Sequence, residues 1–60
     1  MARRLARMVG KTVTIKFLRQ DRRPRDVVLR GVYDDGMEVE YGPGIRAFVF
    51  FVAIEEVMPK

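Results

Sequence analysis

Hydrophobic and polar side chains alternate along most of this 60-residue chain, and that period is typical of β-strands with one buried face. The clearest stretch is 12–18, where Val13, Ile15 and Phe17 share one face and polar side chains share the other. Short turns rich in Gly and Asp separate later stretches of the same kind. The pattern predicts strands at about 12–18, 27–33, 37–41, 45–54 and 57–58.

The residues before the first strand have helical spacing instead. Leu5, Met8 and Val9 fall on one stripe of a helix over about 2–9, and Gly10 follows in a position that favours a left-handed glycine. Two turns offer too little apolar area for stable membrane binding. We therefore expect the helix to lie on its own domain.

Residues 47–54 form an apolar run without interruption. Side chains of a strand alternate across a sheet, so both faces of this strand need cover. We predict an all-β fold with one domain over 1–60: a small five-stranded antiparallel barrel of SH3-like type, with a bent fourth strand and a short N-terminal α-helix. Some of the run exceeds what the barrel encloses, and we expect it to be buried between subunits; the alternative is that the helix covers it. The predicted interface consists of Phe48, Val49, Phe50, Phe51, Val52, Val57 and Met58.

Charge is divided between the two halves of the chain. Residues 1–31 carry ten Arg or Lys and two Asp, whereas residues 32–60 carry two Arg or Lys and six Asp or Glu. Such a dipolar surface favours binding of a polyanion and attraction between copies. The basic side chains form two clusters, one on the helix (Arg3, Arg4 and Arg7) and one in a long loop after the first strand (Arg19, Arg22, Arg23 and Arg25). Nucleic acid is the expected ligand.

Composition narrows the remaining chemistry. Cys and His are absent, which excludes disulfides and speaks against a transition-metal site. Without Ser as well, the common nucleophile and base arrangements are missing, so we expect neither catalysis nor a cofactor nor a metal. A 60-residue chain buries a small core, and oligomerisation is the remaining aid to its stability. With no signal sequence or membrane span in the sequence, we expect a cytoplasmic protein with no membrane partner.

Several short motifs occur in the order found in one family of small barrels. Residues 53–59, Ala-Ile-Glu-Glu-Val-Met-Pro, are similar to the Ala-Ile-x-x-Val-x-Pro ending of the RNA chaperone Hfq. The other matching motifs are Gly10 to Ile15, Leu29-Arg30-Gly31, Asp34-Asp35-Gly36-Met37 and Ile45-Arg46. The chain thus resembles the Sm-like family over nearly its whole length. It departs from the family at Glu38, where the motif has Asn, at Ala47, where it has Gly, and at 50–52, where Hfq has Tyr-Lys-His.

The resemblance implies a homo-oligomeric ring of six or seven subunits, formed by pairing the fourth strand of one copy with the fifth of the next. It also implies single-stranded RNA as the ligand. By motif position, Tyr33, Asp34, Met37 and Arg46 would complete a base-binding pocket. Tyr41 is expected in the core, and Glu38 and Glu40 are interpreted as acceptors for arginines of a neighbouring subunit.

Two alternatives stay open. One is an oligomeric protein-interaction or scaffold module that does not bind RNA. The other is a barrel like that of a ribosome maturation factor, whose pattern is also compatible with 10–15 and 54–57.

Overall fold

The computed structural model describes the backbone of residues 2–60 and the side chains from Arg4 onward; the side chain of Arg3, predicted to bind RNA, lies outside the described residues. A short helix precedes five strands. The elements are α1 (Ala2–Ala6), β1 (Thr12–Phe17), β2 (Arg25–Val32), β3 (Gly36–Gly42), β4 (Ile45–Phe50), the 3-10 helix η1 (Phe51–Ala53) and β5 (Ile54–Pro59).

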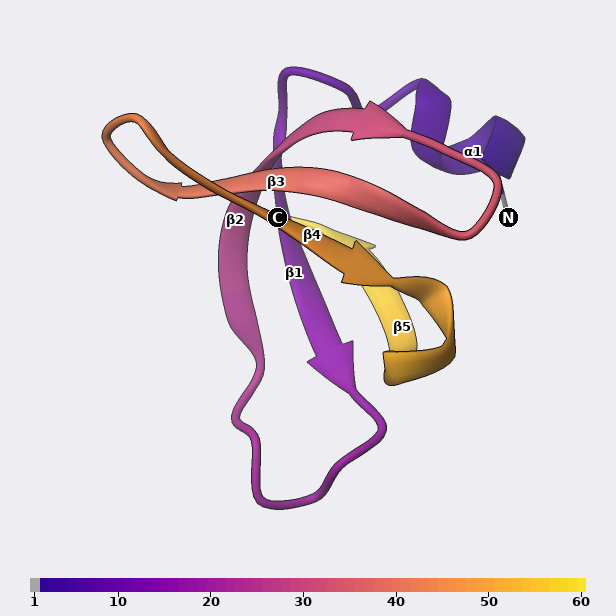
Figure 1. The fold of residues 1–60 in the computed structure, drawn as a ribbon, viewed down its shortest axis with the longest axis vertical. Helices are drawn as coiled ribbons and strands as arrows, with labels where there is room; N and C mark the ends of the chain where they lie inside the picture. The colour runs from indigo at the N-terminus through magenta and orange to yellow at the C-terminus, as the bar shows by residue number, and fades with distance from the viewer. Residues whose placement is uncertain (1) are drawn as a thin grey trace.

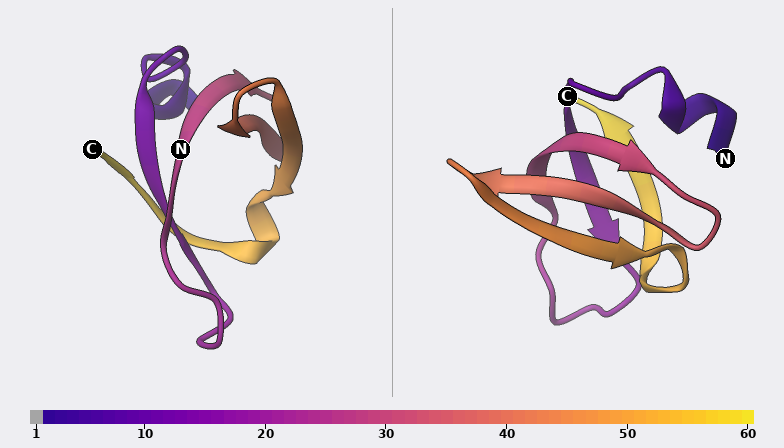
Figure 2. Two further views of the ribbon diagram at one scale, coloured as in Figure 1. Left: turned by 90° about the vertical axis from the view of Figure 1, so that its left-hand side faces the viewer. Right: turned by 45° about the horizontal axis from the view of Figure 1, so that its top comes forward.

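All five strands belong to one antiparallel sheet with the order β4-β3-β2-β1-β5, so β4 and β5 are its edges. Figures 1 and 2 show that the sheet curls, which places β3 and β4 across the interior from β1 and β5. Among residues 2–60, no backbone ladder joins β4 to β5. The predicted five antiparallel strands and short helix are confirmed, but closure of the barrel is not observed.

The core fills the inside of this curl. Val13, Ile15 and Phe17 are all buried, which confirms the predicted inward face of β1. The other buried side chains are Leu5, Val27, Leu29, Met37, Val39 and Ile54. Tyr41 was expected among them, but 43% of its surface is exposed, so that prediction is wrong.

The apolar run after Arg46 does not form the single strand predicted at 45–54. Strand β4 ends at Phe50, η1 turns the chain, and β5 begins at Ile54 rather than at Val57. The backbone N–H of Phe51 still donates to the carbonyl oxygen of Asp35 at 2.9 Å, one position beyond the Gly36–Phe50 pair, and the chain turns away from β3 after this bond. The run is therefore shared between an edge strand, a turn and the start of the last strand.

Helix α1 is shorter than predicted and ends at Ala6. Leu5 is buried and Met8 packs against the core, whereas Val9 is 45% exposed. The backbone then passes through Gly10 with a φ of 89°, and the N–H of Gly10 donates to the carbonyl oxygen of Leu29 at 2.7 Å. The helix thus lies on its own domain, as predicted. Within residues 2–60, no helix has the length and apolar character needed to cross a membrane.

Candidate functional site

Three aromatic side chains form a row on the outer side of the sheet near edge strand β4. The ring of Phe48 lies 5.8 Å from that of Tyr33 and 5.1 Å from that of Phe50, measured between centroids. Between 42% and 54% of each of these side chains is exposed. Helix α1 contacts β2 and does not cover the row, so the alternative in which the helix covers the surplus apolar surface is wrong. We call Tyr33, Phe48 and Phe50 the aromatic row.

Two glycines let the rings lie close to the backbone. A Cβ atom at Gly36 would come within 2.5 Å of the Phe48 ring and of the carbonyl oxygen of Val49. At Gly31, a Cβ would lie 3.1 Å from the Tyr33 ring. The aromatic row therefore depends on residues that have no side chain of their own.

Tyr33 and Arg46, which the motif comparison placed in one pocket, do line a common shallow pocket of about 290 Å³ together with Glu38, Ala47 and Phe48. The Arg46 guanidinium lies 3.9 Å from the Glu38 carboxylate and 3.6 Å from that of Glu40. Asp34 is exposed in the turn beyond Tyr33. The pocket thus combines aromatic surface with one acidic and one basic side chain, Glu38 and Arg46.

Met37 does not belong to this pocket, contrary to the motif comparison. Its side chain is 0% exposed and belongs to the hydrophobic core. It lies directly opposite Val49 in the β3–β4 pair, where alternate side chains point inward. A ligand on the surface does not reach Met37 in this conformation.

The predicted interface residues divide into two groups. Phe48, Phe50 and Val52 are exposed, and Val52, at 84%, is the most exposed of the large hydrophobic side chains that the structure describes. The remaining four are partly buried: Val49, Phe51, Val57 and Met58. Val49, Phe51 and Val57 pack against the core. The exposed group therefore offers the accessible apolar surface.

The second basic cluster lies around the loop between β1 and β2. The Arg22 guanidinium lies 4.0 Å from the centroid of the Phe17 ring, and that of Arg25 lies 5.0 Å from the centroid of the Tyr41 ring. Arg23 is exposed between them in the sequence. We call Arg22, Arg23 and Arg25 the arginine end. Among residues 4–60, no carboxylate oxygen lies within 4.0 Å of their guanidinium nitrogens.

The other arginine of this loop differs from these three. Arg19 forms an ion pair with Asp21 at 3.1 Å, within the loop itself. Arg4 and Arg7 are exposed on and just after α1. Figure 1 places α1 and the β1–β2 loop at opposite ends of the long axis, so the backbone positions of Arg4 and Arg7 are separated from the loop arginines by the length of the sheet.

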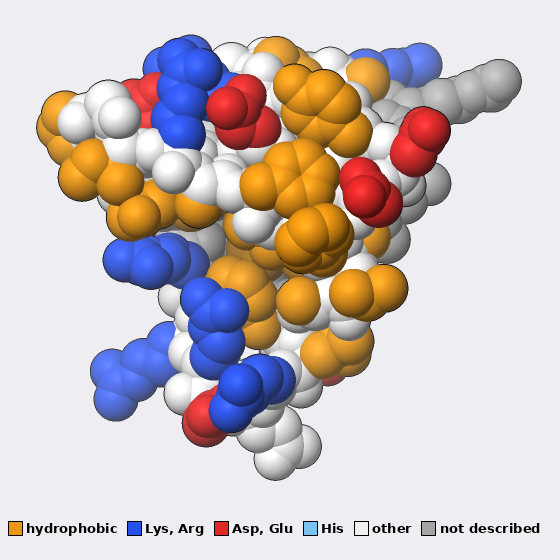
Figure 3. Space-filling model, in the orientation of Figure 1, with side chains coloured by type: hydrophobic (Ala, Val, Ile, Leu, Met, Phe, Trp, Pro, Cys, Tyr) orange, Lys and Arg blue, Asp and Glu red, His pale blue; other side chains and the backbone are white. Residues whose placement is uncertain are grey.

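Figure 3 shows how these groups share one face of the molecule. Hydrophobic side chains gather over its upper part with acidic groups beside them, while Lys and Arg side chains gather over the loop below. No protein-family model, curated protein or solved structure matches this chain. The resemblance to the Sm-like family rests on the short motifs at 10–15, 29–31, 34–37, 45–46 and 53–59.

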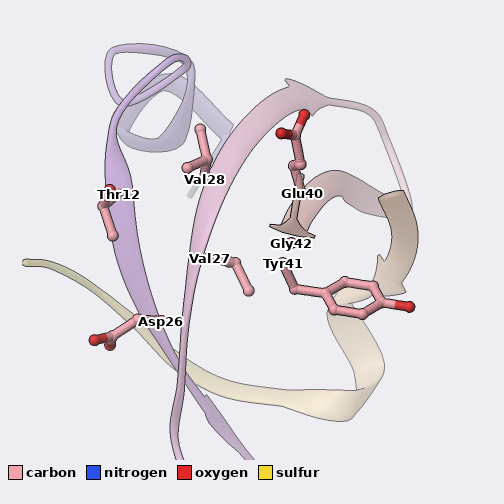
Figure 4. Close-up of a pocket in the computed structure, with 7 residues that line it drawn as sticks. All are labelled: Thr12, Asp26, Val27, Val28, Glu40, Tyr41 and Gly42. Carbon is pink, nitrogen blue, oxygen red and sulfur yellow. The ribbon is translucent and has the colours of Figure 1, made fainter. Parts of the chain in front are cut away.

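Two carboxylates, those of Asp26 and Glu40, line a further pocket of about 240 Å³, and each is bound by a different cationic side chain (Figure 4). Asp26 accepts hydrogen bonds from Lys60 at 2.6 Å and from Thr14 at 2.7 Å, and these bonds lower its pKa. Glu40 accepts a hydrogen bond from Arg30 at 3.2 Å, which lowers its pKa in the same way. Both carboxylates are therefore ionised and neutralised by a nearby cation.

Glu38 and Glu40 were interpreted as acceptors for arginines of a neighbouring subunit, but the structure shows partners for both within the same chain. These cationic partners are Arg30 and Arg46. On β5, Glu55 accepts a hydrogen bond from Lys16, which raises the pKa of the lysine. The carboxylates that have no cation within 4.0 Å among residues 4–60 are Asp34, Asp35 and Glu56.

Proposed function

We propose that this chain is a small protein of the Sm-like type that binds single-stranded RNA and assembles into a ring of six or seven copies. The observation that carries the proposal is the arginine end. Arg22, Arg23 and Arg25 are exposed together at one end of the molecule and have no carboxylate partner among residues 4–60. Unpaired guanidinium groups are the preferred partners of phosphate, because their N–H donors match two phosphate oxygens at once.

The affinity of such a surface depends on how many phosphates it neutralises. Three arginines on one copy support weak binding that does not depend on base sequence. A ring repeats the arginine end on every copy, and a flexible RNA strand can then contact several of them, which raises the overall affinity without new contacts. Ring assembly and RNA binding thus support each other in the proposal.

The edge strands support assembly. Both β4 and β5 have an unpaired side within residues 2–60, and β4 carries exposed Phe48 and Phe50. An exposed apolar edge strand favours pairing with another chain. Because the two edges are different surfaces, contact of β4 with β5 of the next copy is heterologous, and such contacts form a ring when the rotation between neighbouring copies closes.

A salt titration tests RNA binding. Fluorescence anisotropy of a labelled, unstructured RNA oligonucleotide is measured over a series of salt concentrations. For the double variant Arg22→Ala/Arg23→Ala, we expect the slope of log affinity against log salt to become shallower by about 1.4 for each copy that the RNA contacts, or about 0.7 for each lost phosphate contact on a single strand. The slope reports the number of phosphate contacts.

Arg19→Ala is the matched control, because it removes one arginine from the same loop. Arg19 is already paired with Asp21 at 3.1 Å, so we expect a smaller change in slope per arginine than in the double variant. Absence of binding by the wild-type chain at low salt would contradict the proposal. A double variant whose slope equals that of the wild type would do so as well.

One observation favours the alternative of a scaffold that does not bind RNA. The aromatic row, the largest exposed aromatic surface described here, lies beside Asp34 and Glu38 rather than beside the arginine end. Carboxylates repel phosphate, so this surface fits a protein partner better than an RNA strand. An assembled wild-type protein that binds no RNA at low salt would favour the scaffold.

A further inference from the structure

A cavity of about 190 Å³ opens between the arginine end and the β3–β4 hairpin. It is lined by Ile15, Val27 and Val39, each at most 4% exposed, and by Ala47 and Val49 of β4. Figure 3 shows the surface hollowed between the hairpin, at the left, and the loop below it. We call this the loop cavity, and its inner walls are aliphatic.

Two guanidinium groups line the same cavity. The Arg22 guanidinium lies over the Phe17 ring and that of Arg25 over the Tyr41 ring, and all four side chains line the cavity. A guanidinium held over an aromatic ring by a cation–π contact keeps N–H donors that can still bind an anion. Arg22 is also placed by its own backbone, whose N–H donates to the carbonyl oxygen of Arg19 at 3.2 Å. Among residues 4–60, no carboxylate uses these donors.

We propose that the loop cavity binds a small carboxylate with a branched aliphatic body, whose anionic head is held by Arg22 and Arg25. The apolar body replaces water against the aliphatic walls, and the head receives charge-assisted hydrogen bonds at the opening. The occupant is thus defined by two complementary features of one site, an aliphatic interior and two unused cationic donors.

The size and lining of the cavity favour some anions over others. An apolar cavity of about 150 Å³ in another protein is large enough for benzene, so the loop cavity accommodates a body of five or six carbon atoms. A nucleobase is disfavoured, because the aliphatic inner walls leave the polar edge of the base without hydrogen-bond partners, and the two aromatic rings of the lining, Phe17 and Tyr41, each already carry a guanidinium. Inorganic phosphate gains nothing from the aliphatic interior.

The site goes beyond the proposed RNA function, although Arg22 and Arg25 belong to both. The two can be separated at Arg23, which does not line the loop cavity. Arg23→Gln lowers RNA affinity if the RNA proposal is correct and leaves carboxylate binding unchanged. The RNA affinity and the carboxylate affinity of Arg23→Gln therefore test the two proposals separately.

Tyrosine fluorescence provides the test. The chain has two tyrosines, so Tyr33→Phe leaves Tyr41, which lines the cavity, as the reporter. Titration with 4-methylpentanoate is expected to give a saturable change with a dissociation constant on the order of 1 mM, within the range for a ligand of fewer than about ten heavy atoms. Its neutral amide is expected to bind about tenfold more weakly, and acetate to give no saturable change.

Variants assign the binding to the cavity. In the Tyr33→Phe background, Arg25→Gln is expected to weaken binding about tenfold, and Arg23→Gln to leave it unchanged. Ala47→Leu fills the cavity and is expected to abolish binding. Circular dichroism checks that this variant folds, and Ala47→Val takes its place if it does not.

Three results would overturn the proposal. The amide binding as tightly as the carboxylate would remove the role of the arginines. Equal weakening by Arg23→Gln and Arg25→Gln would show general attraction of anions instead of a site. Tighter binding of N-acetylleucine than of 4-methylpentanoate would assign the cavity to the C-terminus of a peptide instead of a free acid.

Discussion

The aromatic row on β4 and the arginine end beside β1 and β2 both combine aromatic rings with charge, but they do so in opposite ways. In the row, Phe48 contacts other aromatic rings, and the nearby arginine, Arg46, is paired with carboxylates. At the arginine end, Arg22 and Arg25 lie on the rings themselves and have no carboxylate partner among residues 4–60. The first surface is apolar and its nearby arginine is paired, whereas the second keeps its cationic charge available.

This difference assigns different partners to the two regions. An apolar edge gains free energy by excluding water against another protein surface. Unpaired guanidinium groups gain more from an anion that releases its own counterions. We therefore expect assembly and anion binding to be separable by mutation.

We expect the largest effect from a substitution at Gly36, which lies under the Phe48 ring of the aromatic row. In Gly36→Ala, the new methyl group overlaps the Phe48 ring and the backbone oxygen of Val49 at 2.5 Å. The backbone can relieve this overlap only by a shift that costs free energy, so we expect the free energy of unfolding to fall by about 1–3 kcal/mol in urea denaturation. Gly31→Ala is the matched control. Its methyl group meets the movable end of Tyr33 at 3.1 Å, and a loss as large as that of Gly36→Ala would contradict this account.

A charge in the row is the next test. Phe48→Glu places a carboxylate on the apolar edge, and we expect self-association to weaken by about 2 kcal/mol per contact, the amount typical of one buried Phe. Light scattering at several protein concentrations measures the change. Leu18→Glu adds the same charge at a side chain 54% exposed near the β1–β2 loop and should leave the mass unchanged. If the mass of the assembly falls equally in both variants, the aromatic row is not the interface.

A smaller effect is expected from acid. The pKa values of Asp26 and Glu40 are lowered in the folded state by hydrogen bonds from Lys60 and Arg30. The unfolded chain therefore binds more protons as the pH falls through their ordinary values of 3.8 and 4.5, and stability present above this range is lost below it. Urea midpoints between about pH 7 and pH 3 measure the loss, and Glu40→Gln should reduce it. A midpoint that rises on acidification would contradict the assignment.

Local patterns predicted much of the fold. Alternation at Val13, Ile15 and Phe17 identified β1 and its buried face, and Gly10 was correctly placed at a left-handed turn, although the helix ends earlier, at Ala6. The break at 51–53 could not be predicted, because it contains neither Gly nor Pro and lies where the pairing of β4 with β3 ends. The position of that end is set by the alignment of the two strands in the folded sheet, which no local pattern contains.

Less of the candidate site followed from the sequence. Charge counting found the arginines of the loop but could not distinguish Arg19, which is paired, from Arg22, which is stacked on a ring. Motif position placed Met37 in a pocket, although the alternation of β3 turns it into the core. The glycines at 31 and 36 carried a usable signal, since Gly within a strand indicates close approach of another group, here an aromatic ring.

Sedimentation velocity with a fluorescently labelled RNA oligonucleotide tests the separation of the two regions most directly, because it reports the size of the assembly and the bound RNA together. For Arg22→Ala/Arg23→Ala at low salt, we predict an assembly that sediments like the wild type but carries less RNA. An assembly that falls apart in this variant, or one that keeps all of its RNA, would contradict the account.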